Sequence, residues 1–348
     1  MEQFASMVSK RAIHLVQLES IETRYTKQWR YHLPDLMSNN GFYVFEYYGA
    51  ELDPVASPGA FLNWSSTNYF KSSQGMKIAK AFDNGRVHPG DVFLFTDFWN
   101  PVVIMVKYMS VMMNIPVKII GLAHAGSYDE WDWLGRQTRN NDHWVKTTEG
   151  AMTSCYDAVV FATHFHREMF QVIANEYGGI TDEVIAGFPM EYIKGIAKPS
   201  YEKQNMVLFT QRNAPEKQPW LFDKLARDLK DTGITFVNVQ DLKCSKEQYH
   251  EFLNSAKLVV SFAQQETLGI TPYEALVCGC DILVPNRLSY REMYSPDFRY
   301  NHDEEVAELV LEKLQYFDSS REKIQAEADR VGSIFFSSEK LINLLKSI

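Results

Sequence analysis

The sequence predicts an α/β fold of two successive domains, and three observations support this prediction. The chain has 348 residues, which exceeds one ordinary core and fits two domains of about 150 residues each. Short apolar runs alternate with amphipathic segments, as expected for parallel sheets flanked by helices. The stretch Ser261–Pro285 repeats this pattern as strand, turn, helix and strand. A helix N-terminus just beyond a strand is a typical place for an anionic ligand.

The expected domain boundaries follow from where the alternation pauses. Residues 1–190 form the first predicted domain, 191–204 a polar linker, and 205–330 the second domain. Residues 331–348 are predicted as a helix that packs back on the first domain. The predicted strands are 12–17, 41–48, 91–96, 117–122, 158–162, 206–210, 234–239, 257–262 and 281–284.

The composition excludes several classes of protein. A content of 45% hydrophobic and 23% charged residues is typical of a globular enzyme. Four cysteines without C-x-x-C spacing predict reduced thiols in a cytoplasmic compartment and no zinc site. The N-terminus lacks the apolar run of a signal peptide. A net charge of −9 argues against broad nonspecific binding of nucleic acid, although a local basic groove stays compatible with it.

The most apolar tract, residues 101–122, is interrupted by Lys107 and Pro116. It predicts a buried helix followed by a strand, because a membrane span needs about 20 uninterrupted apolar residues. Four methionines of this helix are predicted to form a packed core face. The alternative, a face that lies on a membrane surface, has too few flanking basic residues for anionic lipid. The four methionines are Met105, Met109, Met112 and Met113.

The helix within Ser261–Pro285 carries its own boundary signals. Thr271 is a plausible N-cap, Pro272 suits the first turn, and Glu274 occupies the third helical position. Gly279 is predicted to end the helix. Glu266 stands eight positions before Glu274, so two carboxylates flank the helix entry.

Glu266-Thr-Leu-Gly269-Ile-Thr-Pro-Tyr-Glu274-Ala-Leu-Val-Cys-Gly279 resembles the E-x7-E signature of retaining GT-B glycosyltransferases, and it is most similar to family 4. Arg212 and Lys217, five positions apart after a strand, resemble the cationic pair of that family. His124, after strand 117–122, resembles its active-site histidine. The resemblance covers about residues 90–300. It implies two Rossmann-like domains whose parallel sheets face each other across a cleft.

The resemblance also implies an activity. The expected enzyme is a retaining, metal-independent transferase whose co-substrate is a nucleotide-sugar, most simply a UDP-sugar, with no further cofactor. One feature departs from the family, which places a glycine-rich loop after the first strand. Here Gln17 is followed by Leu-Glu-Ser-Ile-Glu-Thr-Arg-Tyr, without a glycine. No phosphate contact is therefore predicted for this loop.

The resemblance assigns the leaving diphosphate to Arg212 and Lys217. Fixed cations stabilise charge that grows in the transition state. The alternative is a surface loop with two solvated charges. Backbone N–H groups at Thr267, Leu268 and Gly269 are expected to hold the sugar and phosphate, because glycine permits close approach.

The remaining assignments each have a structural alternative. By resemblance, Glu274 accepts hydrogen bonds from the ribose hydroxyls, but it could instead complete a capping box with Thr271. Glu266 is expected beside the transferred sugar, where it would otherwise be an ordinary loop carboxylate. His124 would contact the donor sugar or the acceptor hydroxyl, unless it is a satisfied core histidine.

Two clusters suggest the acceptor. Arg24, Lys27, Trp29 and Arg30 interleave cations with an aromatic ring, a mixture that suits phosphate contacts and base stacking. A second cluster consists of Arg136, Arg139, His143, Trp144 and Lys146. Ordinary amphipathic helices with snorkelling cations are the alternative for both.

The region Pro296–Asn301, followed by Glu304–Leu314, weakly resembles phage DNA glucosyltransferases, and the first domain resembles transferases that mannosylate queuosine in tRNA. The leading hypothesis is therefore a phage-type enzyme that glycosylates 5-hydroxymethylcytosine in duplex DNA in the host cytoplasm. A family 4 transferase acting on a glycan, lipid, tRNA base or small metabolite is the alternative. A catalytically silent sugar- or nucleic-acid-binding module is a second alternative.

Overall fold

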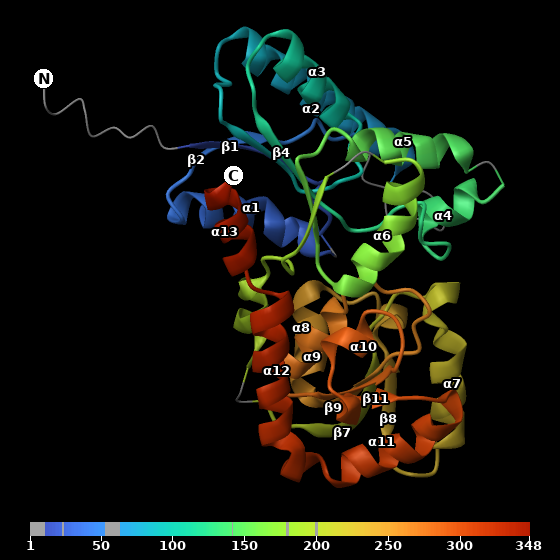
Figure 1. The fold of residues 1–348 in the computed structure, drawn as a ribbon. Coiled ribbons are helices and arrows are strands. Elements are labelled where there is room, and N and C mark those ends of the chain that lie inside the picture. Colours follow the sequence, from blue (N-terminus) through green and yellow to red (C-terminus); the bar gives the residue numbers. More distant parts are fainter. Residues whose placement is uncertain (1–10, 23, 53–62, 141, 179–180, 199–200) are drawn as a thin grey trace, which may run out of the picture. The chain divides into compact units, whose positions relative to one another are not determined.

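The computed structural model describes residues 11–22, 24–52, 63–140, 142–178, 181–198 and 201–348. They divide into two compact units, each built on one parallel sheet (Figure 1). The first unit comprises the described parts of Met1–Phe161 and Arg167–Ala186, together with Glu339–Ile348. The second comprises the described parts of Ala162–His166 and Gly187–Ser338.

The first unit contains a six-stranded parallel sheet in the order β2-β1-β3-β4-β5-β6. Its inner strands are buried apolar runs, as expected for a parallel sheet covered on both faces. The strands are β1 (Ala12–Val16), β2 (Tyr43–Tyr47), β3 (Val92–Phe95), β4 (Lys118–Leu122), β5 (Ala158–Phe161) and β6 (Asp182–Ile185). The helices are α1 (Tyr25–Asn39), α2 (Trp64–Asp83), α3 (Val102–Met112), α4 (Trp133–Thr138), α5 (His143–Thr153), most of α6 (His164–Glu176) and α13 (Glu339–Ser347).

The second unit contains a five-stranded parallel sheet in the order β11-β10-β9-β7-β8. Helix α7 packs against α11, while α9 packs against α8 and α12. The strands are β7 (Gln204–Phe209), β8 (Thr235–Asn238), β9 (Ala256–Val260), β10 (Asp281–Pro285) and β11 (Arg299–Tyr300). The α-helices are α7 (Pro219–Asp228), α8 (Lys246–Ser255), α9 (Ile270–Val277), α10 (Tyr290–Met293), α11 (Val306–Gln315) and α12 (Arg321–Phe335). Short 3-10 helices lie at 191–196, 215–217, 239–242, 296–298, 303–305 and 317–320.

Two segments differ from the sequence prediction. Pro, Gly, Ser and Asn are frequent in residues 53–75 and predict a loop there, and 53–62 lie outside the described residues. Helix α2 nevertheless begins at Trp64, because the Asn63 side chain caps it by accepting from Ser66 N at 3.1 Å. Residues 331–348 are not one helix: α12 ends at Phe335, and α13 begins at Glu339 within the first unit. There the Arg11 Nη1 group donates to Leu345 O at 3.3 Å.

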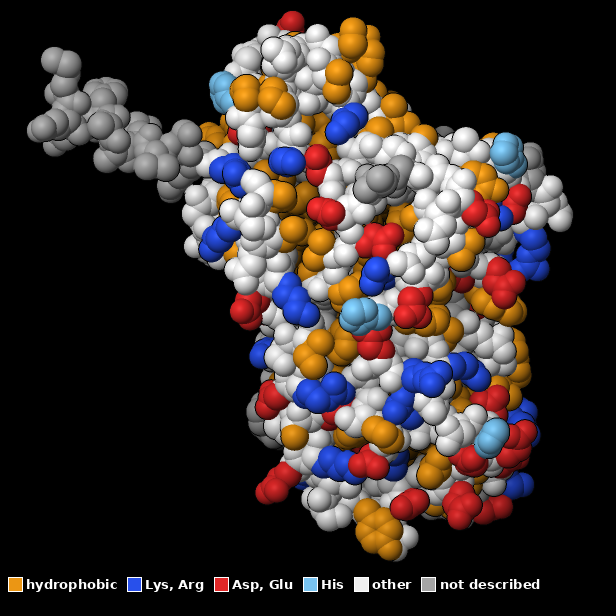
Figure 2. Space-filling view, in the orientation of Figure 1, with side chains coloured by type: hydrophobic (Ala, Val, Ile, Leu, Met, Phe, Trp, Pro, Cys, Tyr) orange, Lys and Arg blue, Asp and Glu red, His pale blue; other side chains and the backbone are white. Residues whose placement is uncertain are grey.

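The prediction of a packed methionine face on α3 is wrong for three of its four residues. Met105, Met112 and Met113 are 44–67% exposed, and only Met109 packs against the core. The core side of α3 is formed instead by Val102, Val103, Val106 and Ser110. The helix is apolar on both sides, so its period could not tell which side is buried. Figure 2 shows hydrophobic side chains exposed on the upper part of the molecule, over α2 and α3.

Among the described residues, every helix is too short or too polar to cross a membrane. The four cysteines are free thiols, and Cys278 and Cys280 are buried. Burial raises the pKa of both of these thiols. They are therefore protonated at neutral pH and behave as small apolar side chains.

Candidate functional site

The predicted donor residues lie together at the carboxyl ends of strands in the second unit. Arg212 and Lys217 follow β7, and residues 266–269 lie between β9 and α9. The turn that carries Lys217 is tied to the loop after β9, because Gln264 N donates to Glu216 O at 2.7 Å. The carboxyl edge of a parallel sheet is where ligands bind in open α/β folds.

Lys217 forms an ion pair with Glu266, as Nζ lies 3.4 Å from Oε2. The two side chains are only 8% and 19% exposed. Lys217 Nζ also donates to the backbone oxygen of Gln265 and to its Oε1 at 3.2 Å. The ammonium group is thus held at a fixed position beside the carboxylate, which the sequence resemblance did not specify.

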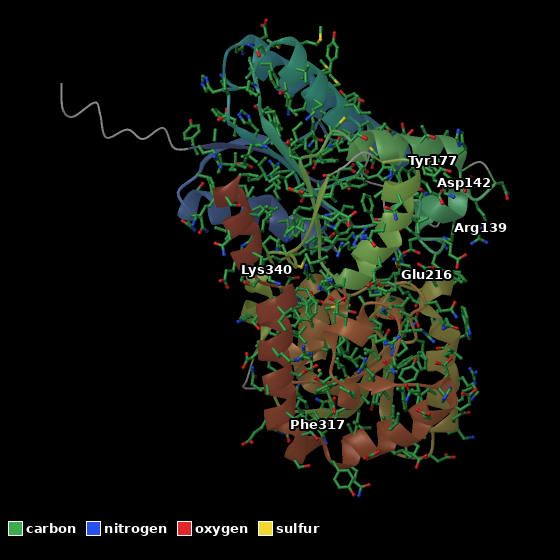
Figure 3. All side chains as sticks on the ribbon, viewed as in Figure 1. Arg139, Asp142, Tyr177, Glu216, Phe317 and Lys340 are labelled. Carbon is green, nitrogen blue, oxygen red and sulfur yellow. The ribbon has the colours of Figure 1, made fainter. Side chains whose placement is uncertain are left out.

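Arg212 is held by a buried carboxylate that the sequence analysis missed. Its Nη2 group donates to Glu216 Oε1 at 2.5 Å, and Glu216 is fully buried while the Arg212 side chain is 38% exposed. Glu216 is labelled in Figure 3. The only signal in the sequence was the spacing of four residues, which is common on any helix. The pair fixes one end of the guanidinium and leaves part of it exposed to solvent.

A buried tyrosine, Tyr290 at the start of α10, connects the site to the protein interior. Its hydroxyl accepts from Gln211 Nε2 at 3.0 Å and lies 3.2 Å from Ser261 Oγ. The same hydroxyl donates to Glu266 Oε2 at 3.5 Å, a long contact. Glu266 Oε2 therefore has a cation on one side and a phenol on the other. Tyr290 lies 24 residues after Glu266, so no local sequence pattern joined them.

Gly269 has a packing role that the sequence did not predict. A Cβ atom at this position would lie 2.7 Å from Tyr290 Cε1 and 3.2 Å from the Tyr294 hydroxyl oxygen. Its N–H donates to Met293 Sδ at 3.3 Å, and its carbonyl accepts from the Tyr294 hydroxyl at 2.6 Å. The glycine is required because two buried tyrosines occupy the space of a side chain.

The neighbouring residues of this loop are also engaged. Leu268 is 6% exposed, so its side chain belongs to the core. Thr267 O accepts from Thr163 Oγ1 at 2.9 Å within the second unit. A backbone cradle for the sugar and phosphate at residues 267–269 stays a prediction.

The predicted helix cap at Thr271 is wrong, and with it the capping-box alternative for Glu274. Helix α9 begins at Ile270, its N-cap is Gly269, and no side chain caps it. The Glu274 carboxylate accepts instead from the Tyr249 hydroxyl at 2.7 Å. Burial raises the pKa of Glu274. The predicted end of the helix is confirmed, since Gly279 follows the C-cap with φ +73°.

In the first unit, His124 lies just beyond β4, and both of its ring nitrogens are engaged. Nε2 lies 2.7 Å from Thr96 O, and Nδ1 lies 2.7 Å from the Tyr25 hydroxyl. A carbonyl oxygen only accepts, so Nε2 carries the proton and Nδ1 accepts from Tyr25. Burial lowers the pKa of His124, which keeps the ring neutral. A ligand that reaches Nδ1 has to displace the Tyr25 hydroxyl.

Two acidic side chains, Asp97 after β3 and Glu19 after β1, follow neighbouring strands of this sheet and were not predicted from the sequence. Lys71 Nζ donates to Asp97 Oδ2 at 2.8 Å and also to Trp99 O. Burial alone would raise the pKa of Asp97, but the Lys71 ammonium group lowers it, so the carboxylate is charged. Glu19 accepts from Thr67 Oγ1 at 2.7 Å, and burial raises the pKa of Glu19.

Most side chains of the first cluster (Arg24, Lys27, Trp29 and Arg30) make contacts within the first unit. Trp29 is only 2% exposed and packs edge-on against Tyr25 and His124, so its prediction as a base-stacking residue is wrong. Arg30 Nη1 donates to Gln17 Oε1 at 2.8 Å, and its guanidinium lies 3.4 Å from the centre of the Tyr48 ring. Lys27 is paired with Glu22. Arg24 is the N-cap residue of α1, without a side-chain capping bond.

The second cluster is arranged in a similar way. Arg136, in α4, lies over the Trp133 ring, 5.9 Å from its centre. Arg139, labelled in Figure 3, donates to Glu130 O at 3.3 Å and lies 4.0 Å from the Glu130 carboxylate. Lys146 is paired with Asp142 at 2.6 Å. These contacts favour the structural alternative over a phosphate-binding groove.

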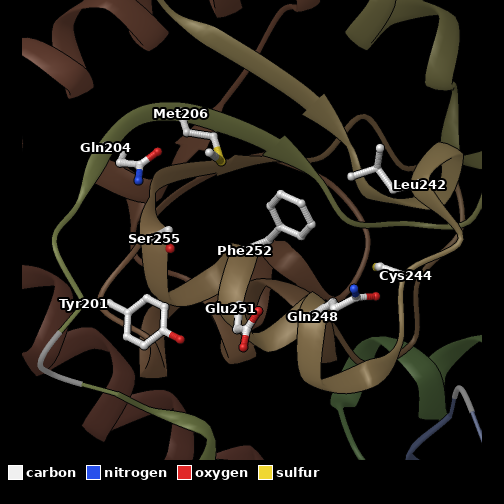
Figure 4. A pocket seen from close by; sticks show the side chains of 9 residues that line it. All are labelled: Tyr201, Gln204, Met206, Leu242, Cys244, Gln248, Glu251, Phe252 and Ser255. Atoms are coloured by element: carbon white, nitrogen blue, oxygen red, sulfur yellow. The ribbon is translucent and has the colours of Figure 1, made fainter.

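A cavity of about 480 Å³ opens beside α8 in the second unit (Figure 4). None of the predicted donor residues lines it. The lining residues are Tyr201, Gln204, Met206, Leu242, Cys244, Gln248, Glu251, Phe252 and Ser255. Within the described ranges, no group of three or more His, Cys, Asp or Glu side chains is placed to hold a metal ion. The predicted metal independence stays a prediction.

Three solved structures of carbohydrate synthases serve for comparison. Sucrose-phosphate synthase from Thermosynechococcus elongatus superposes with a TM-score of 0.61 at 12% identity, over 97% of this chain and 98% of that one. Starch synthase IV from Arabidopsis thaliana, bound to ADP and acarbose, gives 0.64 at 11% identity, over 97% and 98%. The UDP-forming trehalose-phosphate synthase of Burkholderia vietnamiensis gives 0.62 at 10% identity, over 98% and 100%. At such identities the similarity shows the fold alone, and the predicted α/β fold of GT-B type is confirmed.

Two curated proteins resemble part of the chain in sequence. A tRNA-queuosine alpha-mannosyltransferase of Drosophila melanogaster is 29% identical over 114 residues. An alpha-1,6-glucosyltransferase of Actinobacillus pleuropneumoniae is 31% identical over 96 residues. The matches cover 32% and 26% of this chain, but only 29% and 28% of these relatives. The chain thus spans less than a third of the relatives it matches. No protein-family model matches the sequence.

Proposed function

We propose that this chain is a glycosyltransferase that moves a sugar from a nucleotide-sugar, a UDP-sugar in the simplest case, to a hydroxyl group. The observation that carries the proposal is the set of charges at the carboxyl edge of the second sheet. There Arg212 is held by the buried Glu216, and Lys217 is paired with Glu266. Both sequence relatives are named as sugar transferases, which supports the same activity.

The proposed reaction breaks the bond between the anomeric carbon and the diphosphate oxygen. Arg212 and Lys217 stabilise the negative charge that the diphosphate gains as this bond breaks. Glu266 stabilises the positive charge that develops on the sugar ring. Glu274 accepts hydrogen bonds from the ribose, and Tyr249 orients its carboxylate.

The acceptor hydroxyl attacks the anomeric carbon on the face from which the diphosphate leaves, so the configuration is retained. Its proton passes to the leaving phosphate oxygen, and no metal ion is required. His124, neutral and in the first unit, contacts the sugar or the acceptor hydroxyl once the Tyr25 hydroxyl leaves Nδ1. Retention, metal independence and membership of family 4 are parts of the proposal that rest on the sequence resemblance.

For the acceptor, we propose a hydroxyl group on a modified nucleoside. The sequence hypothesis names 5-hydroxymethylcytosine in DNA, and the similarity to a tRNA-queuosine mannosyltransferase supports a nucleoside as well. Because Lys27, Arg30 and Arg139 are engaged by neighbouring groups, recognition relies on the nucleoside more than on the phosphates of its strand. The affinity for nucleic acid should therefore depend only weakly on salt.

A panel experiment tests both parts of the proposal. UDP-, GDP- and ADP-sugars are incubated with hydroxymethylcytosine DNA, with tRNA, and with glycan or lipid acceptors, and products are identified by mass spectrometry. Transfer to a nucleoside is the expected outcome, and it should be lost in Glu266→Ala but kept in the control Glu251→Ala. Transfer to a glycan, lipid or small metabolite alone would replace the nucleoside proposal. Absence of both transfer and donor hydrolysis, with sugar or nucleic acid still bound, would favour the binding-module alternative.

A further inference from the structure

We infer that Tyr290 is a positioning residue that fixes the orientation of Glu266 for the transfer reaction. This inference rests on the proposed function, and it concerns a residue outside the signature that suggested that function. The evidence is the arrangement of the buried polar side chains that surround the Tyr290 hydroxyl.

The hydroxyl group of Tyr290 lies among three polar side chains, Gln211, Ser261 and Glu266. Gln211 Nε2 donates to it at 3.0 Å, while Ser261 Oγ lies 3.2 Å away and itself donates to Gln211 Oε1 at 2.9 Å. Since Gln211 supplies an N–H and Ser261 gives its own proton to Gln211, the Tyr290 proton has two acceptors, Ser261 Oγ and Glu266 Oε2. The distance to Glu266 Oε2 is 3.5 Å. Gln211 and Ser261 are only 5% and 1% exposed, so this hydrogen-bonded group is shielded from water.

The ring of Tyr290 is as firmly held as its hydroxyl. Tyr290 is fully buried, and its ring occupies the space that a Cβ atom of residue 269 would need. Rotation of the phenol away from Glu266 would open a void beside Gly269 in a close-packed interior. The ring thus packs α10 against the loop that carries Glu266 and keeps the two segments in a fixed arrangement.

Both contacts of Glu266 with other side chains use the same oxygen. Lys217 Nζ lies 3.4 Å from Oε2, and the Tyr290 hydroxyl lies 3.5 Å from it. Two donors that converge on one oxygen define the plane and direction of the carboxylate. The other carboxylate oxygen, Oε1, then keeps a fixed orientation in which it can act on the sugar. Without Tyr290, Lys217 alone would leave the carboxylate free to turn about its last bond.

Tyr294 provides a matched control four positions along the chain. It is also a buried tyrosine, 2% exposed, and its hydroxyl donates to Gly269 O at 2.6 Å. No hydrogen bond joins it to Glu266. Replacing either tyrosine by phenylalanine keeps the ring and removes one buried hydroxyl, so the two variants should lose similar stability. Only the Tyr290 variant removes a contact of Glu266.

The test compares Tyr290→Phe with Tyr294→Phe. Tyr290→Phe should lower kcat about tenfold, with KM for the donor within about twofold because positioning acts in the transition state. Tyr294→Phe should leave kcat unchanged. In a Glu266→Gln background, Tyr290→Phe should cause no further loss. Unchanged kcat in Tyr290→Phe, equal losses in both phenylalanine variants, or full additivity with Glu266→Gln would overturn the inference.

A second measurement separates this inference from the proposed function. The 13C chemical shift of the Glu266 carboxyl carbon, recorded at neutral pH, should change in Tyr290→Phe and stay the same in Tyr294→Phe. If the wild-type chain transfers no sugar, the proposed function fails, but the carboxyl shift still decides whether Tyr290 orients Glu266. If Tyr290→Phe does not fold, Ser261→Ala removes one neighbour of the hydroxyl and should change the same signal. An unchanged signal would then overturn the inference.

Discussion

Replacing Gly269 by alanine distinguishes a packing role from a ligand-binding role for this residue. The added Cβ would lie 2.7 Å from Tyr290 Cε1, 3.1 Å from its Cδ1 and 3.2 Å from the Tyr294 hydroxyl oxygen. Carbon atoms in contact are normally about 3.5–4.0 Å apart, so the shortest approach is about 1 Å too close. The backbone itself allows alanine, because Gly269 has φ −74° and ψ 74°.

The expected loss of stability follows from how little the neighbours can move. Tyr290 and Tyr294 are buried, and the Tyr290 hydroxyl is held by Gln211. Overpacking of this kind typically costs about 1–3 kcal/mol. We therefore expect Gly269→Ala to lower the urea midpoint of the second unit without a ligand, while the slope m is unchanged.

The control for this experiment is Gly195→Ala in the same unit. A Cβ on Gly195 meets no atom within 4 Å, and its φ is not positive. This variant should match the wild type or gain about 0.4–1 kcal/mol, because alanine restricts the unfolded chain. If Gly269→Ala unfolds at the wild-type urea concentration and loses only nucleotide affinity, the packing explanation is refuted and glycine is needed for ligand approach.

Three further predictions concern the charged groups and the first unit. Arg212→Met should reduce kcat by about 100- to 1,000-fold in steady-state assays of the folded variant. It should also destabilise the second unit, because it removes an ion-pair partner of the buried Glu216 carboxylate. An undiminished kcat would remove Arg212 from the diphosphate site. The affinity for UDP, measured by calorimetry, should rise with pH in a range above the ordinary pKa of glutamate. Burial raises the pKa of Glu274, so the carboxylate that accepts from ribose forms only at higher pH. Titration of UDP itself is common to both proteins, so the rise should be smaller in Glu274→Gln, and identical pH profiles would contradict a ribose contact. Trp29→Ala should lower the free energy of unfolding in urea by about 3–5 kcal/mol. Tyr31→Ala on the same helix should lower it hardly at all, because Tyr31 is 67% exposed. A stable Trp29→Ala variant that binds nucleic acid less tightly would restore the stacking role.

Some of the fold could be predicted because its signals are local. Buried strands such as Val92–Phe95 and Leu258–Val260 are continuous apolar runs, and Gly279 ends a helix by a rule that involves only adjacent residues. The donor residues were selected through the resemblance to retaining GT-B glycosyltransferases, which depends on spacing along the chain: Arg212 and Lys217 come after β7, and Glu266 precedes α9. Parallel strands bring their carboxyl ends to one edge, so order along the chain was enough to bring them together.

Other features depended on contacts between distant segments. Trp29 and the methionines of α3 are both apolar, and only packing decided that Trp29 is buried while Met105 and Met112 are exposed. A charged or aromatic pattern on a helix likewise does not reveal that Arg30 is engaged by Gln17 and Tyr48. Composition describes which contacts a side chain is able to make, and tertiary structure decides which of them it makes.

The sequence by itself determined the alternation of strands and helices and the position of the two glutamates, because these depend on spacing along the chain. The tertiary structure decided how the glutamates are held. Glu274 meets Tyr249 from a different helix, and Glu266 meets Lys217 from the 3-10 helix at 215–217 and Tyr290 from α10. Such partners are separated by 24 to 49 residues. Only folding of the whole second unit gives them a common position, since the hydrogen bonds that orient a carboxylate require distances of a few ångströms.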